Sequence, residues 1–143
     1  MIASGFLNLI TLIAQRNSKN SLLMDISQTL QRMQQAASNA LELLHNQQEI
    51  ENQRIEVQLD NLDPNTSDYT QQYQELLTEQ QKLTQQQAKE TQRLEEEWKR
   101  KEDPYERLQE QVQTEVEAIE ADIDGTREVV QQNASTEFSM FAS

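Results

Sequence analysis

The sequence contains no cysteine, and its 143 residues include only two glycines, two prolines and one histidine. The lack of cysteine excludes disulfide bonds and zinc–thiolate sites. A single histidine excludes a metal site built on a pair of histidines. Gly5 and Gly125 stand alone, so no glycine-rich phosphate loop exists. The sequence therefore predicts a protein that is not an enzyme and has no cofactor, metal or catalytic residue.

Apolar residues are also scarce, at 35% hydrophobic and 5% aromatic, whereas glutamine occurs 23 times. Abundant Gln, Glu, Leu and Lys with few helix breakers favour long helices over strands and turns. The predicted fold class is all-α, and the predicted architecture is a long antiparallel helical hairpin that resembles a coiled coil.

The net charge of −13 is distributed unevenly along the chain. Residues 1–41 carry three basic residues and one acidic residue, whereas residues 105–143 carry nine acidic and two basic residues. An acidic protein repels phosphates, which argues against a nucleic acid as partner.

The first fourteen residues, Met1–Ala14, form the one stretch that is apolar nearly all the way round. As a helix this segment would reach about 21 Å, short of a hydrocarbon core of about 30 Å. The nearest basic residues, Arg16 and Lys19, follow the apolar run, whereas a secretory signal has them in front. The segment must find cover, and we expect other parts of this protein to supply it.

Turn formers and apolar spacing divide the chain. Gln15–Ser21 is polar and rich in capping residues, which predicts a break or a weak joint. Asp63–Ser67 predicts a tight turn, and Pro104 predicts a kink within one long second arm. The prediction is one elongated helical domain, residues 1–143. Its parts are an apolar terminal helix (1–14), a first arm (21–62), a turn (63–67) and a second arm in two parts (68–102 and 105–141).

Two further expectations concern how the arms pair. Beyond Pro104 the apolar residues step by four, four and three, an eleven-residue repeat typical of a straight or slightly right-handed pairing. If the chain folds at residue 65, residue i lies opposite residue 130 − i. Ile13, Ile10 and Leu7 would then pack beside Val116, Ile119 and Ile123.

The layout resembles flagellins and the type III-secreted filament proteins, in which apolar terminal helices pair as an antiparallel coiled coil. The matching features are Met1–Ala14 and Val112–Phe141 on either side of a glutamine-rich middle. The sequence departs from that pattern in having only Asp63–Ser67 at the hairpin tip, where flagellins carry a globular insertion. The resemblance implies a homopolymer outside the cell or on its surface, exported without a cleaved leader, with other copies and an export chaperone as partners.

The leading hypothesis is thus a structural subunit that assembles through its termini into a filament or tube. The alternatives are a cytoplasmic or membrane-peripheral scaffold that uses Met1–Ala14 as an interfacial anchor, and a small chaperone or adaptor. The residues predicted to mediate self-association are apolar and lie near the two ends: Ile2, Phe6, Leu7, Leu9, Ile10, Ile13, Val116, Ile119, Ile123, Val130, Phe138, Met140 and Phe141.

Overall fold

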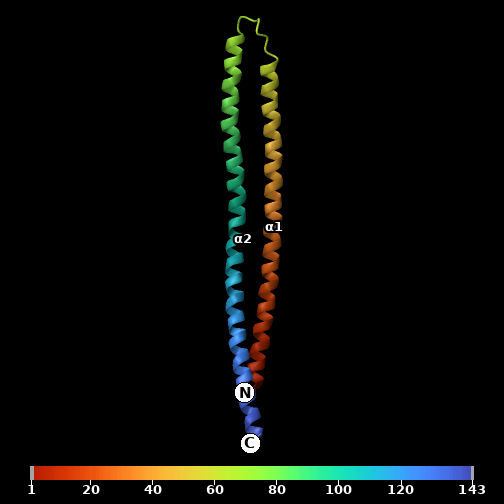
Figure 1. Cartoon of the computed structure of the whole chain (residues 1–143), viewed down its shortest axis with the longest axis vertical. Coiled ribbons are helices and arrows are strands. Elements are labelled where there is room, and N and C mark those ends of the chain that lie inside the picture. The colour runs from red at the N-terminus through yellow and green to blue at the C-terminus, as the bar shows by residue number, and fades with distance from the viewer. Residues whose placement is uncertain (1, 143) are drawn as a thin grey trace. The chain divides into compact units, whose positions relative to one another are not determined.

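The structure, a computed structural model, describes the backbone of residues 2–142 and the side chains of residues 4–140. Helix α1 spans Ile2–Asp60 and helix α2 spans Tyr69–Ala142. The described residues contain no strand, and the two helices pack against each other (Figure 1). This confirms the predicted all-α helical hairpin.

The chain divides into two compact units, and both helices contribute to each of them. The terminal unit combines residues 1–31 with residues 103–143. The turn unit is formed by residues 32–102.

The loop of the turn unit lies between Asp60 and Tyr69 and contains the predicted turn. The Asp63 carboxylate accepts a hydrogen bond from the Asn65 backbone N–H at 2.9 Å, and the Asp63 carbonyl accepts one from the Thr66 hydroxyl at 2.7 Å. Such side-chain bonds stabilise the loop and replace the helical hydrogen bonds that end there.

The terminal unit has a small apolar core. Ile26 and Leu30 of α1 pack against Val112 and Val116 of α2, and all four are 6% exposed or less. Beside this core, the Gln109 amide donates a hydrogen bond to the Ser27 hydroxyl across the two helices at 3.1 Å. Apolar burial and cross-helix hydrogen bonds therefore act together along this seam.

The predicted eleven-residue repeat is wrong. Apart from Glu115, the buried and half-buried side chains of α2 from residue 109 to residue 133 recur at alternating steps of three and four: Gln109, Val112, Val116, Ile119, Ile123, Thr126, Val130 and Asn133. A seven-residue spacing results, which is typical of coiled-coil pairing. The prediction placed Leu108, Arg127 and Ala134 in the seam, and all three are exposed. The seam instead contains the polar residues Gln109, Thr126 and Asn133, which an apolar pattern does not reveal.

The predicted register is also wrong. In the terminal unit, Gly5 lies against Val130 and Lys19 against Glu115, so residue i faces approximately residue 135 − i. The offset from the prediction is about five residues, or roughly 7.5 Å of helix. Leu7 and Ile10 also lie on the side of α1 that faces away from the seam, so they do not pack on Ile119 and Ile123. Their side chains are 66% and 61% exposed.

The physical reason lies in the loop of the turn unit. The prediction reflected the chain about one residue and so assumed that both arms begin at the same height. In Figure 1 the first turn of α2 stands beyond the last turn of α1, because the loop advances along the hairpin before α2 begins. Each α1 residue therefore faces a position further along α2 than a symmetric turn would give.

The expected break at Gln15–Ser21 is absent, because α1 continues through these residues. Arg16 and Lys19 occupy half-buried seam positions, and the capping residues Asn17 and Ser18 are exposed, where a helix tolerates them. Helix α2 continues through Pro104, as expected for one long second arm. Proline has no N–H, so the carbonyl of Arg100 loses the helical hydrogen bond it would otherwise accept.

Candidate self-association surface

The predicted self-association residues fall into two groups in the terminal unit. The first group lies in the hairpin's own seam. Val116, Ile123 and Val130 are buried, with Ile123 only 1% exposed. Leu9, Ile13 and Ile119 are half-buried. These six side chains bury much of their surface in the seam between α1 and α2 of the same chain.

The second group is exposed. We call Phe6, Leu7 and Ile10 the opening face of α1; they are 49%, 66% and 61% exposed. Near the other end of the chain, Phe138 and Met140 are 75% and 73% exposed. The side chains of Ile2 and Phe141 lie outside the described residues.

The exposed group at the end of α2 belongs to a segment that extends past α1. Asn133 is half-buried, whereas every described side chain from residue 134 to residue 140 is exposed. Figure 1 shows this end of α2 reaching beyond the N-terminal end of α1. We call residues 134–142 the tail.

Among the described side chains, one ion pair joins the two helices of the terminal unit. The Lys19 Nζ lies 2.7 Å from the Glu115 Oε2, with both side chains more than a third exposed. The hydrogen bond from Lys19 lowers the pKa of the Glu115 carboxyl below its ordinary value, and the Gln111 amide, which donates to Glu115 Oε1 at 3.3 Å, lowers it further. The sequence analysis did not foresee this pair, because the expected register placed Lys19 elsewhere.

The lowered pKa of Glu115 predicts a pH dependence of stability. A carboxyl with a lower pKa in the folded state stabilises the fold at pH values above its unfolded pKa, and the contribution disappears as the pH falls through the folded value. Glu115→Gln should therefore lower the melting temperature near neutral pH and have little effect in strong acid. Glu117→Gln, an exposed neighbour, is the control. A deficit that stays constant down to about pH 2, well below the ordinary glutamate pKa, would contradict this assignment.

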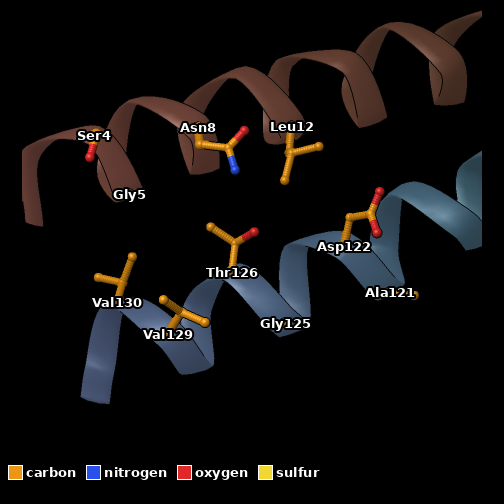
Figure 2. Close-up of a pocket in the computed structure, with 10 residues that line it drawn as sticks. All are labelled: Ser4, Gly5, Asn8, Leu12, Ala121, Asp122, Gly125, Thr126, Val129 and Val130. Atoms are coloured by element: carbon orange, nitrogen blue, oxygen red, sulfur yellow. The ribbon is translucent and has the colours of Figure 1, made fainter. Parts of the chain in front are cut away.

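An open groove of about 750 Å³ lies between the helices near their ends in the terminal unit. In Figure 2, Asn8 and Leu12 from α1 and Thr126 and Val130 from α2 point toward one another across it. Small side chains leave the groove open, among them Ser4, Ala121 and Gly125. Sequence reasoning missed this groove, because it considered large apolar residues and not the small residues that face each other across the two helices.

The two glycines differ in their surroundings. A Cβ added at Gly5 would lie 2.8 Å from the Val130 Cγ2, which is too close, whereas one added at Gly125 would have no atom within 4 Å. Gly5 therefore permits the close approach of α1 to α2, and Gly125 only lines the open groove.

We predict opposite outcomes for alanine at these two sites. Gly125→Ala should stabilise the protein by about 0.5–1 kcal/mol, because alanine is the better helix former and has space there. Gly5→Ala should gain less or destabilise, since Val130 must move. Melting temperatures of the two variants compare the sites directly. An equal gain at both would contradict the close packing at Gly5.

Other classes of site are not indicated within the described residues. No group of three or more His, Cys, Asp or Glu side chains is placed there to hold a metal ion, and no helix is long and apolar enough to cross a membrane. Comparisons with protein-family models, curated proteins and solved structures found no match.

Proposed function

We propose that this protein is a non-enzymatic structural subunit that assembles with copies of itself, through its terminal unit, into a filament or tube. The observation that carries the proposal is the opening face. Three large apolar side chains are about half to two-thirds exposed on a segment, residues 1–15, that contains no charged residue. Covering such side chains stabilises an assembly by roughly 1.5–3 kcal/mol each.

The arrangement supports an open polymer more than a closed dimer. The opening face and the tail are two different apolar surfaces near the same end of the terminal unit. If the opening face of one copy binds the tail of the next, the contact is heterologous. Heterologous contacts that do not close into a ring continue as helical polymers.

The charges of the terminal unit favour the same pairing. Residues 1–31 carry two basic residues and one acidic residue, whereas residues 103–143 carry two basic and ten acidic residues. Two α2 segments from different copies would therefore repel each other, and a neutral or weakly basic α1 segment would not. Contacts between α1 of one copy and α2 of the next are the favoured combination.

Removing either surface tests the proposal. Deletion of residues 134–143, or Phe6→Ser combined with Ile10→Ser, should leave a helical protein that does not form filaments. Circular dichroism measures the helicity, and negative-stain electron microscopy measures the assembly. Met24→Ser is the matched control, because Met24 is 63% exposed on α1 but lies outside both surfaces. Long filaments from either variant would contradict the mechanism.

The second candidate function is a membrane-peripheral scaffold, because the opening face also suits a lipid interface. Residues 1–15 lack lysine and arginine, which such anchors usually carry on their polar face. Co-sedimentation with anionic liposomes separates the two. The scaffold is favoured if the protein forms no filaments, binds the liposomes, and loses that binding when Phe6→Ser is combined with Ile10→Ser. If the protein forms filaments, we place them outside the cell or on its surface, as the resemblance to filament proteins implies.

A further inference from the structure

The turn unit carries a second set of exposed apolar residues, on the outer side of α1. Leu43, Ile50 and Val57 are 61%, 66% and 56% exposed. They are seven residues apart, so they form one column along the helix over about 21 Å. Isolated exposed apolar residues are common on protein surfaces, but a column at coiled-coil spacing is typical of a helix-packing seam. We call these three residues the apolar column.

A column of carboxylates runs beside it at the same spacing. Glu42, Glu49 and Glu56 precede the three apolar residues by one position each, and all three are exposed. Among the described side chains, none of these carboxylates forms an ion pair or a side-chain hydrogen bond. Arg54 is the one basic residue between positions 33 and 81, apart from the neutral His45. The acidic column therefore has almost no counter-charge in its own helix.

In coiled-coil terms, the apolar column occupies the a positions and the acidic column the flanking g positions. The d positions between them hold amides, Asn46 and Gln53. Amides do not prevent packing in this unit, because its inner seam buries Gln48 and Gln87, each 8% exposed. The outer face of α1 thus repeats the mixed amide and apolar character of the seam that already joins α1 to α2.

We propose that this face binds a helix of another protein, one that presents an apolar column at seven-residue spacing flanked by a column of lysine or arginine. Basic side chains at the flanks would pair with Glu42, Glu49 and Glu56 while the apolar columns interlock. The surface lies in the turn unit, so the proposal does not depend on self-assembly through the terminal unit.

A second copy of this chain is a poor occupant. Two α1 faces packed antiparallel would place the acidic columns against each other, and packed parallel they would form only the Glu49–Arg54 pair in each direction. The α2 helix of a second copy offers basic residues such as Lys82 and Lys89. However, within the turn unit its described residues expose one large apolar side chain, Tyr73. No surface of the turn unit therefore supplies both columns.

A labelled peptide tests the proposal on the full-length protein. The probe, called the Lys peptide, is a synthetic four-heptad peptide with Ile at a, Gln at d and Lys at e and g. The control, called the Glu peptide, is identical except that Glu replaces each Lys. Fluorescence anisotropy should detect binding of the Lys peptide, weakened by added salt, and at least tenfold weaker binding of the Glu peptide. Ile50→Gln should weaken binding of the Lys peptide about tenfold or more, because the central apolar contact is lost.

Charge reversal separates this face from the general acidity of the protein. Glu42→Lys, Glu49→Lys and Glu56→Lys together should abolish binding of the Lys peptide and permit binding of the Glu peptide. The matched control changes three exposed carboxylates of α2 by the same total charge: Glu75→Lys, Glu79→Lys and Glu95→Lys. This control should retain the preference for the Lys peptide.

Four results would overturn the proposal. They are no binding of either peptide, equal binding of both, binding that Ile50→Gln does not change, and equal loss in the two charge-reversed proteins. A change in the oligomeric state of the chain on Ile50→Gln, measured without peptide, would assign the face to a second copy and also overturn it. None of these results depends on whether filaments form.

Discussion

Replacing Ile123 by aspartate should destabilise the terminal unit by several kcal/mol. Ile123 is 1% exposed and is the largest fully buried side chain of the described residues. A carboxylate at this position would lose its hydration without gaining a cation, since an unpaired buried charge is strongly unfavourable. We expect a lower melting temperature and a first loss of helicity confined to the terminal unit. Circular dichroism melts and hydrogen exchange would detect the two effects.

The matched control is Ile10→Asp, which changes an apolar residue of the facing helix to the same charge. Ile10 is 61% exposed, so the substitution should alter stability by less than about 0.5 kcal/mol. Both variants are best measured in protein lacking residues 134–143, where assembly does not contribute to the melt. Equal destabilisation by the two substitutions would contradict the exposed position of Ile10.

The sequence predicted the helices and the turn because these depend on local properties. Asp63 and Pro64 stop α1, and the chain on either side has few breakers and many strong helix formers. The seven capping-rich residues 15–21 were predicted to break the helix, but tertiary packing overrides weak local preferences. Lys19 reaches Glu115 across the seam, and the neighbouring polar side chains remain in solvent.

The register and the exposed surfaces depend on relations that no local pattern contains. When the loop lets α2 begin beyond the end of α1, each α1 residue faces a position further along α2. The sequence of residues 61–68 does not reveal how far α2 begins beyond the end of α1. The sequence placed Leu7 and Ile10 in the seam, whereas the structure leaves them 66% and 61% exposed. Their exposure follows from the face of α1 that meets α2: Leu9, Leu12 and Ile13 lie on the seam side, and Leu7 and Ile10 lie on the opposite side. Because the first fourteen residues are apolar nearly all the way round, their pattern does not single out one face.

A reciprocal amide pair gives the turn unit its register. The Gln48 Nε2 donates to the backbone carbonyl of Gln87 at 3.1 Å, and the Gln87 Nε2 donates to the backbone carbonyl of Gln48 at 3.2 Å. Gln48 also donates to the Thr91 hydroxyl at 3.2 Å. Gln87 also donates to the side-chain oxygen of Asn52 at 3.1 Å and to the Glu51 carboxylate at 3.4 Å. These five bonds form together in one alignment of the helices only.

Replacing one member of the pair should destabilise the turn unit. Gln87→Ala removes the three bonds that the Gln87 side chain donates and leaves a void beside Gln48, at a cost of about 1–3 kcal/mol. The melting temperature of the turn unit should fall accordingly. Gln86→Ala, an exposed neighbour, is the control and should change stability little.

Replacing both members should have the opposite effect on stability and a large effect on register. Gln48→Leu with Gln87→Leu should equal or exceed the stability of the native protein, since apolar pairs of similar size can replace a buried polar pair without loss. Leucine packs in several alignments, so the helices should populate more than one register. Because the chain has no cysteine, spin labels at Gln53→Cys and Gln81→Cys, both exposed, report the distance between the helices cleanly. We expect one narrow distance distribution with the native amides and a broad or multiple one with the two leucines. A single narrow distribution in the leucine variant would show that apolar packing alone sets the register.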